Sequence, residues 1–522
     1  MKNYILKLGV LFLGISLVYS CEPGIAINDN STSDFGYTLY VDSLANKNAP
    51  SLQSFVHAVN GEEWLLFAGR TNQSEDNGGL HDMTGNYTDT SFPPPSYNDS
   101  IFVYNVSTDT RTAISLDDMK ATLKSKYPNN YKAIQGFESV FRNSNPLVRQ
   151  DGDYLYVVGG YGPQNFQKTA AKGYNFISYD HVGKIHVPSL VNLVKGDYAN
   201  VDASKLFSFG RNKQLAVTGA ELLKVGINFY AVTGHCFGNN CSGFQKYQDA
   251  AYPFTISKDT LHQLTISLGN PITDVIDPTA TIADDLSNFR RRDQPIVPAI
   301  YKSPANQKIQ EGIAIYAGVF KAGNDNNLQA WNDAIYIHPS WANNEGRLFT
   351  QDKAYNQNNY NVYACPSFVL YDSASDISHT YLLGGIGDGK FSENGFLSGF
   401  TNTAVRIETN IGQYPISSSH ELIQPDNLFN KSSQNKAPFY GAEAILFANS
   451  SLPLTKAWYT DANGKWQQEE TEIIDLANAG DGDIVIGHVY GGIEAFHANP
   501  ATFGPRKSRA SNVIFKVILK KN

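Results

Sequence analysis

Short apolar segments that run into glycine recur along the chain. Six strand-like stretches, rich in Val, Ile, Leu and Tyr, end in one or two Gly, at 64–69, 154–160, 228–234, 313–318, 381–385 and 484–492. An apolar stretch and a polar turn precede each one, as in Phe55–Val59 before Asn60-Gly61, and another strand-like stretch follows, as in Phe176–Tyr179 after the second. Strand, turn, strand ending in Gly, loop and strand is the pattern of an antiparallel blade.

The spacing of these repeats distinguishes between two repeat architectures. The key glycines at 69, 160, 234, 318, 385 and 492 are separated by 91, 74, 84, 67 and 107 residues. Solenoids stack near-identical repeats, and these intervals are too uneven for that. A β-propeller tolerates them, because its strands are fixed while its loops vary. The pattern therefore predicts six blades of four antiparallel strands.

The recurring glycine predicts where polar side chains gather. A residue without Cβ allows inner strands of neighbouring blades to approach each other around the axis. The residues that follow each Gly would then project towards one mouth of the central channel, where Arg70, Tyr161 and His235 could form a ligand floor. The alternative is that these three side chains satisfy backbone groups in the channel.

The remaining elements support a single domain over residues 37–522. Residues 116–126 are the best helix candidate, in the long connection between the first two repeats. Residues 83–98, with three consecutive prolines, are expected to be a loop insertion. An early strand at Tyr37–Val41 is expected to close the ring beside residues 513–519, which would leave no free sheet edge.

Composition excludes several classes of protein. Apolar residues make up 42% of the chain and charged residues 17%, which excludes a disordered chain or a coiled coil. The formal net charge is −8, and the one basic cluster, Arg290-Arg291-Arg292, is followed at once by Asp293. A nucleic-acid-binding role is therefore not expected.

The N-terminus is typical of an export signal. Lys2 and Lys7 form a positive segment before an apolar run at 8–18, which is too short to span a bilayer comfortably. Ser20-Cys21 resembles the lipobox of bacterial lipoproteins, with a bulky Tyr19 at its middle position. We expect residues 1–20 to be removed, Cys21 to be lipidated and residues 21–36 to form a polar tether to a membrane of the cell envelope. An ordinary signal peptide is the alternative.

The cysteines fit an exported protein. Cys236 and Cys241 flank a turn-like stretch, so a local disulfide is expected, although two unpaired thiols are the alternative. Cys365, in an apolar run, is expected to be a buried spectator. The eleven His residues are scattered without a ligand motif, so neither a metal nor another cofactor is predicted.

Several segments together resemble a largely uncharacterised family of Kelch-like β-propeller proteins exported by Bacteroidota. The carriers of the resemblance are Gly69-Arg70-Thr71-Asn72 with Gly79-Leu80-His81, Asp151–Gly162, Arg291-Arg292-Asp293 with Val297-Pro298, Gly312–Phe320, and Gly487–Ile493 with Ala510-Ser511-Asn512. The resemblance covers roughly residues 50–520 and implies the fold. This chain departs from the family's pattern at 73–78, an insertion that separates His81 from Arg70.

Two further groups of charged residues are candidates for chemistry. Arg291 and Arg292 could hold a carboxylate or phosphate, whereas a clamp between blades through Asp293 is the structural alternative. Glu443 heads a strand and could pair with an Arg or act as a general acid or base.

The leading functional hypothesis is a binding or interaction module at the cell envelope, with a glycan or a protein as its partner. A second hypothesis is a sugar-metabolising enzyme. Resemblance to Kelch-type sialic-acid mutarotases makes isomerisation of an acidic sugar conceivable, with Arg70 or the Arg291-Arg292 pair holding the carboxylate. A third is a structural envelope protein. An enzyme should bring an Arg, a carboxylate or His, and a Tyr together at one mouth, whereas a structural protein should bury its arginines.

Overall fold

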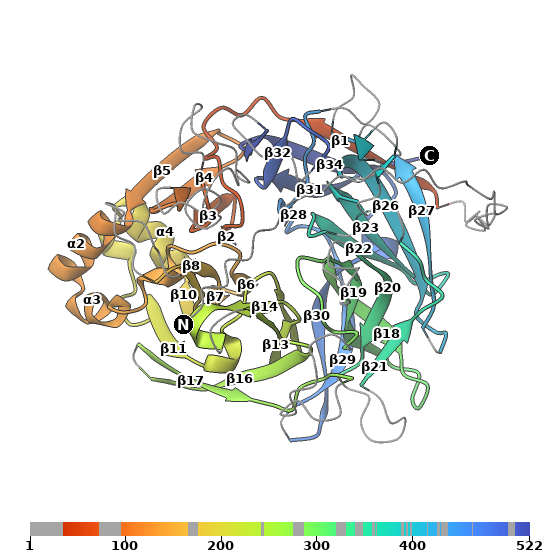
Figure 1. Cartoon of the computed structure of the whole chain (residues 1–522), viewed down its shortest axis with the longest axis horizontal. Coiled ribbons are helices and arrows are strands. Elements are labelled where there is room, and N and C mark those ends of the chain that lie inside the picture. Colours follow the sequence, from red (N-terminus) through yellow and green to blue (C-terminus); the bar gives the residue numbers. More distant parts are fainter. Residues whose placement is uncertain are drawn as a thin grey trace, which may run out of the picture. The chain divides into compact units, whose positions relative to one another are not determined.

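Mostly antiparallel sheets surround a common axis in the computed structural model, and the fold is all-β and propeller-like (Figure 1). Two of the sheets have four strands, and short parallel pairings join further strands into sheets of eight and ten strands. The structure describes residues 35–71, 96–164, 176–241, 245–260, 262–274, 287–319, 330–339, 348–357, 361, 363–387, 391–392, 395–396, 399–414, 416–424, 428–429, 437–461, 463–499 and 507–522. Phe35–Asn522 form one compact unit.

Six sets of four strands can be traced in the described part of the chain, each listed here in the order in which its strands pair. The first three sets are β2 (Val56–Asn60), β3 (Glu63–Phe67), β4 (Ser100–Asn105), β5 (Thr110–Ser115); β6 (Leu147–Asp151), β7 (Tyr154–Val158), β10 (His181–His186), β11 (Phe207–Arg211); and β12 (Glu221–Val225), β13 (Asn228–Val232), β16 (Ala251–Thr260), β17 (Gln263–Leu268). The other three are β18 (Ile296–Lys302), β19 (Ile309–Gly318), β20 (Trp331–Ile337), β21 (Phe349–Asp352); β22 (Ser367–Asp372), β23 (Ile377–Ile386), β26 (Phe400–Asn410), β27 (Ser418–Gln424); and β28 (Ile445–Ala448), β31 (Ile484–Tyr490), β34 (Ile514–Lys521), β1 (Tyr37–Ser43).

The ring closes through the first strand, as predicted. β1 pairs antiparallel with β34, with Tyr37 opposite Lys521 and Val41 opposite Val517. Leu39 and Val41 turn towards the core and are almost fully buried, while alternate residues face outwards, as a half-buried strand requires. The last sheet is therefore built from both ends of the described chain.

The glycine-ended strands occupy the second position of each set. At their ends, five glycine N–H groups donate to carbonyl oxygens of the following set, over 2.7 to 3.0 Å; the pairs are Gly69 to Asn143, Gly160 to Val217, Gly234 to Arg291, Gly385 to Tyr440 and Gly492 to Leu52. Gly159 has φ +66°, and a Cβ built on it would lie 2.2 Å from the Val217 carbonyl oxygen. The glycine thus permits contact between neighbouring sheets, but one strand farther from the axis than predicted.

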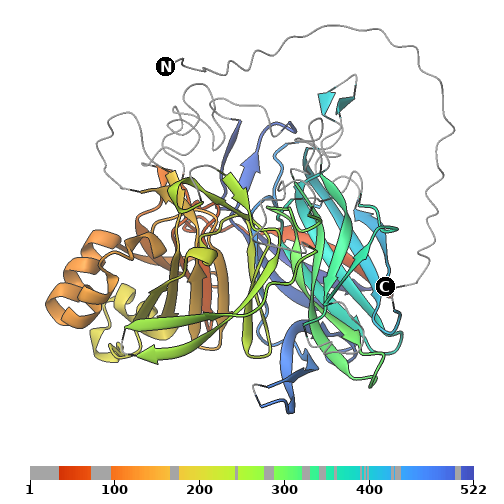
Figure 2. The same ribbon diagram turned by 60° about the horizontal axis from the view of Figure 1, so that its bottom comes forward.

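Short two-stranded ribbons extend from the same ends of the sheets, at the top in Figure 2. They pair β8 (Tyr161–Pro163) with β9 (Phe176–Ser178), β14 (His235–Phe237) with β15 (Gln245–Tyr247), β24 (Phe391–Ser392) with β25 (Gly395–Phe396), and β32 (Ile493–Ala495) with β33 (Ser508–Ala510). The sequence placed the third strand of the second repeat at 176–179. That placement is wrong, because β9 joins a ribbon and β10 takes the place in the sheet.

Helices lie on the outside of the first two sheets (Figure 1). α2 (Leu116–Lys126) confirms the predicted helix, and it is followed by α3 (Pro128–Ile134) and α4 (Val187–Lys195). The Ser115 side chain caps α2 by accepting from the Asp118 N–H at 3.0 Å. Met119 and Leu123 then bury in the core that the two sheets share.

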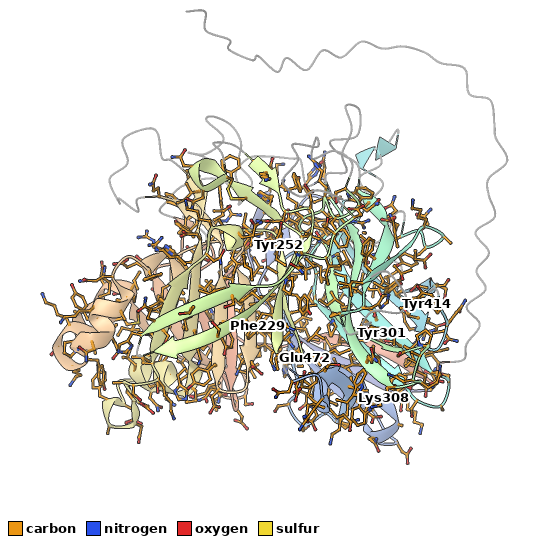
Figure 3. All side chains as sticks on the ribbon, turned by 90° about the horizontal axis from the view of Figure 1, so that it is seen from below. Phe229, Tyr252, Tyr301, Lys308, Tyr414 and Glu472 are labelled. Atoms are coloured by element: carbon orange, nitrogen blue, oxygen red, sulfur yellow. A yellow bond between two sulfur atoms is a disulfide. The ribbon has the colours of Figure 1, made fainter. Side chains whose placement is uncertain are left out.

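One long hairpin departs from the repeat. It is formed by β29 (Leu454–Thr460) and β30 (Trp466–Asp475), inserted between β28 and β31, and it protrudes at the opposite end from the ribbons (Figures 2 and 3). β29 pairs with β19 through Trp458 and Gln310, and β30 pairs with β22 through Ile474 and Leu370. The hairpin therefore connects the last sheet to the fourth and fifth.

Candidate functional site

The first strand of each set lines an axial cavity of about 880 Å³. The walls are largely apolar, with Phe55, Leu222 and Phe368 among the lining side chains. A concave site of this size, with apolar walls and a few polar groups, is typical of small-molecule sites in proteins. We refer to it as the axial channel.

One end of the axial channel is bordered by a rim of equivalent positions just before each first strand. These positions are Ser54, Asn145, Gly219, Asp293, Ala364 and Glu443. Backbone N–H groups connect several neighbours, since Asp293 donates to Gly219, Ala364 to Asp293 and Glu443 to Ala364, over 2.8 to 2.9 Å. Four non-glycine members of the rim, Ser54, Asn145, Asp293 and Glu443, have φ between +50° and +55°. Loops fixed in this way hold their side chains in defined positions.

Glu443 is the most strongly held side chain of the rim. One carboxylate oxygen accepts from the Tyr363 hydroxyl at 2.7 Å. The other accepts from the Ser54 hydroxyl and the Gln53 amide, which belong to the neighbouring first set. Because both oxygens have partners, the carboxylate is fixed in place at the channel end.

Asp293 faces the same end of the channel from the fourth set. Burial raises the pKa of its carboxyl to about 6, the Arg292 guanidinium opposes that rise, and the Glu443 charge adds to it. Burial also raises the pKa of Tyr363 well above its usual value, with further contributions from the charges of Asp293 and Glu443. Tyr363 therefore remains a hydroxyl donor at neutral pH.

Arg292 links Asp293 to the preceding set. Its Nε lies 3.5 Å from the Asp293 carboxylate, and its Nη1 lies 3.2 Å from His235 Nε2. Burial, and secondarily the Arg292 charge, holds the pKa of His235 well below its usual value, so the imidazole is neutral. This arrangement corresponds to the clamp through Asp293 that the sequence analysis gave as the structural alternative. It also places Arg292 next to His235, and both were candidate ligand-binding residues.

The opposite end of the channel is closed in part by the base of the β29–β30 hairpin. Leu454, Glu472 and Ile474 of the hairpin line the cavity, and Glu472 lies near the middle of the molecule in Figure 3. Glu472 pairs with Arg149 of the second set. The hairpin thereby distinguishes the two ends, and the rim that carries Asp293 and Glu443 is the end it leaves uncovered.

His235, which follows the second strand of the third set, does not line the axial channel, and neither do Arg70 and Tyr161, contrary to the prediction from the glycines. They follow the second strand of their sets, and the first strand lies between them and the axis. Arg70 is 1% exposed and bridges to Gln53 and Tyr97 through its backbone, while the Tyr161 ring stacks on Phe176 at 5.5 Å. They line the boundary between the first two sets instead.

Arg291 is also misassigned as a ligand-binding residue. Its side chain is fully buried, and its guanidinium donates to the Asp333 carboxylate at 2.7 Å and to the Ala317 carbonyl at 2.8 Å. The guanidinium lies over the Trp331 ring, 4.5 Å from its centroid. These partners belong to its own set, so Arg291 holds that set together and does not reach the channel.

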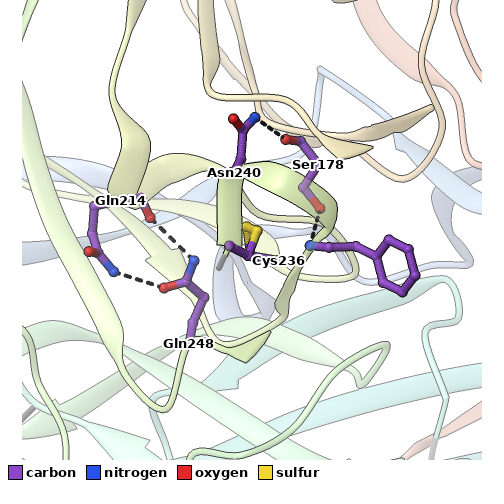
Figure 4. Close-up of a disulfide and its surroundings, with 7 residues drawn as sticks. Ser178, Gln214, Cys236, Asn240 and Gln248 are labelled. Carbon is purple, nitrogen blue, oxygen red and sulfur yellow. Dashed lines mark hydrogen bonds between the residues drawn. A yellow bond between two sulfur atoms is a disulfide. The ribbon is translucent and has the colours of Figure 1, made fainter. Parts of the chain in front are cut away.

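The cysteines occupy two different environments. Cys236 and Cys241 are joined by a disulfide, with their Cα atoms 5.7 Å apart, and Asn240 beside it donates to the Ser178 carbonyl (Figure 4). Cys365 is half-buried and lines the channel near the rim, where burial raises the pKa of its thiol to about 12. It is more exposed than the buried spectator that the sequence predicted.

Two predicted residues lie outside the described part of the chain, namely Cys21 and His81. Within the described ranges, no three His, Cys, Asp or Glu side chains converge on a possible metal position. None of the described helices has the length and apolarity needed to cross a bilayer.

The residues that hold the Glu443 carboxylate in place were not identified from the sequence. Tyr363, Ser54 and Gln53 surround Glu443 from positions up to 390 residues away in the chain, so no local motif marks them. A usable signal was present, because each rim position lies two or three residues before a first strand. Aligning the repeats on that strand, and not on the glycine, brings Ser54 and Glu443 to the same position and Asp293 to the position before it.

Comparison with known proteins identifies no family. No family model matches the chain, and no curated protein matches it. A solved structure described as "Structure of YjhT" aligns over 91% of this chain and 99% of its own, with 10% identity and a TM-score of 0.38. A likeness of this strength defines neither a family nor a ligand.

Proposed function

We propose that the protein is a lipid-anchored protein of the cell envelope whose six sheets are the blades of a Kelch-like propeller, and that it binds a small polar ligand in the axial channel. The channel end bordered by the rim is the entrance in this proposal. The walls would contact the carbon skeleton of a sugar or similar molecule, and the rim would bind its polar groups.

The observation that carries this proposal is the fixed Glu443 carboxylate at the end of a cavity of about 880 Å³ that the β29–β30 hairpin does not cover. Two neighbouring sets contribute groups that hold it, namely Tyr363 from one side and Gln53 with Ser54 from the other. A carboxylate that is already oriented loses little side-chain entropy when it binds a ligand hydroxyl or ammonium group.

The test is a thermal-shift screen of the purified protein against sugars, sugar acids and amino sugars. A ligand at 100 times its dissociation constant stabilises the folded state by about 2.7 kcal/mol, which shifts the melting temperature measurably. Glu443→Gln should abolish the shift, whereas Glu62→Gln, at an exposed turn, should leave it unchanged. A shift that survives Glu443→Gln would place the ligand elsewhere.

The anchor is tested separately. Metabolic labelling with a palmitate analogue should mark the wild-type protein and bring it into the membrane fraction. Cys21→Ser should abolish both, because the acyl chains attach to that thiol. Release of an unlabelled wild-type protein into the soluble fraction would favour the ordinary signal peptide.

A second candidate function is an enzyme that moves protons on a sugar. It is favoured by the presence of Arg292, Asp293, Tyr363 and Glu443 at one channel end, which is the combination expected of an enzyme. Asp293, with its pKa raised to about 6, can donate a proton near neutral pH, while Glu443 can accept one. Faster anomer exchange of a bound sugar in NMR, lost in Asp293→Asn, would establish this function.

A further inference from the structure

The charges that line the axial channel are strongly unbalanced. Four carboxylates line it, those of Glu221, Asp293, Glu443 and Glu472, against one guanidinium, that of Arg149. The Arg149 guanidinium pairs with Glu472 beside the hairpin. The uncompensated carboxylates therefore lie towards the rim, where Arg292 offsets the charge of Asp293 only.

His57, the histidine among the described lining residues, does not offset the negative charge of the carboxylates. Burial lowers the pKa of His57 to about 4, so its imidazole is neutral at pH 7. Burial together with the Asp293 charge raises the pKa of Glu221 to about 7, although Arg149 acts in the opposite direction. A neutral His57 leaves Arg149 as the one cation among the described lining residues, while the raised pKa of Glu221 means that its carboxyl is partly protonated at pH 7.

Two buried amide oxygens next to the rim have no hydrogen-bond donor within the described residues. Gln294 follows Asp293 among the residues that border the channel and is 2% exposed, and its Oε1 accepts no hydrogen bond from the described residues. The Oε1 of the fully buried Gln53, beside Glu443, is in the same situation. Buried acceptors without donors are costly, and a ligand that supplies N–H groups would satisfy them.

The shape of the channel favours a multi-atom cation. Its volume of about 880 Å³ far exceeds that of a bare ion, and its walls carry apolar side chains such as Phe55, Val148 and Ile296. An organic molecule could place a charged nitrogen at the rim and its carbon skeleton against these walls. A divalent metal would use only the carboxylates.

We propose that the axial channel selects a small organic cation, an amine or guanidine whose nitrogen lies between Asp293 and Glu443. This inference rests on the proposed function and specifies its ligand class. It also reverses the expectation of an acidic sugar, since a ligand carboxylate would enter an already negative channel.

The inference is tested by calorimetry with molecules that share a skeleton and differ in charge. Glucosamine, glucose and glucuronate form one such set, and agmatine and 1,4-diaminobutane extend it to guanidines and diamines. At pH 7 we expect glucosamine, or a member of the amine series, to bind at least tenfold more tightly than glucose, and glucuronate to bind least. Calcium and magnesium chloride are run as separate probes.

Substitutions of single carboxylates then test which of them bind the cation. Glu443→Gln and Asp293→Asn should each weaken amine binding at least tenfold without changing the far-UV spectrum. Glu221→Gln provides a second test if either variant is poorly folded. Glu62→Gln is the matched control, because it removes an equal charge at an exposed turn.

Each outcome has a distinct meaning. Binding of glucose or glucuronate as tight as that of the amine, with sensitivity to Glu443→Gln, would overturn the cation preference and leave the channel as a binding site. Tighter binding of a divalent metal than of any amine would also overturn it. Failure of every probe to bind the folded protein would refute both this inference and the proposed small-ligand site.

Discussion

Replacement of Gly159 with alanine tests the contact between neighbouring sheets most directly. Gly159 has φ +66°, a conformation that costs an alanine about 1–2 kcal/mol. The new Cβ would lie 2.2 Å from the Val217 carbonyl oxygen and 3.1 Å from that of Leu215. Both oxygens belong to the backbone that leads into the third set, so a side-chain rotation cannot relieve the overlap.

Relief requires the two sheets to separate at this point. Separation would weaken the bond from the Gly160 N–H to the Val217 carbonyl, which is 2.8 Å long and contributes about 1 kcal/mol. Overpacking of this kind adds about 1–3 kcal/mol. We therefore expect Gly159→Ala to lower the free energy of unfolding by about 3–5 kcal/mol.

Gly152 supplies the matched control at the other end of the same strand, β7. It has φ +57°, and a Cβ built there meets nothing within 4 Å. Gly152→Ala should therefore cost only the conformational part, about 1–2 kcal/mol. Urea unfolding followed by circular dichroism measures both variants. Equal destabilisation by the two substitutions would refute the assignment of these glycines to contacts between sheets.

Three further predictions follow from buried groups. Since burial raises the pKa of Asp293 to about 6 and of Glu221 to about 7, the folded state binds more protons than the unfolded state between about pH 4 and 7. Their contribution should raise the melting temperature as pH falls from 8 to 5, and an unchanged profile in Asp293→Asn with Glu221→Gln would contradict it. Arg291→Met should destabilise the protein by about 3–5 kcal/mol in the same urea assay, because it removes a fully buried guanidinium and leaves the half-buried Asp333 carboxylate without its cation, and a loss below 1 kcal/mol would count against the role of Arg291 within its own set. Mass spectrometry of the untreated protein should show the Cys236–Cys241 pair resistant to alkylation until a reductant is added, and alkylation of both without reductant would exclude the disulfide.

The strands could be predicted from the sequence because their signals are local. All six glycine-ended segments became second strands, and the helix at 116–126 and the closing strand at 37–41 lie where the pattern placed them. Apolar alternation, turn residues and capping each act within a few residues. The local signals therefore located the second strands, the helix and the closing strand, but they misplaced the third strand of the second repeat and did not mark the β29–β30 hairpin.

The site was less accessible to prediction, because it depends on which strand is nearest the axis. The glycine is the clearest mark of each repeat, and it drew attention to Arg70 and Tyr161, which lie one strand away from the channel. Arg291 and Arg292 are neighbours in the chain, yet the first is buried in its own set and the second reaches the preceding set. Adjacent side chains of an extended segment point in opposite directions, so their roles separate only in three dimensions.

Pairing of β1 with β34 has a consequence for biogenesis. The strand at Tyr37–Ser43 pairs with Ile514–Lys521, so it cannot form its ladder until nearly the whole chain has been synthesised. An exposed strand edge is a template for aggregation until it is paired. The export proposed above, if it occurs in an unfolded state, would suit this topology, since folding could begin once both partners had crossed the membrane. A chain shortened by its last eight or nine residues would retain most of its sheets and keep two open edges.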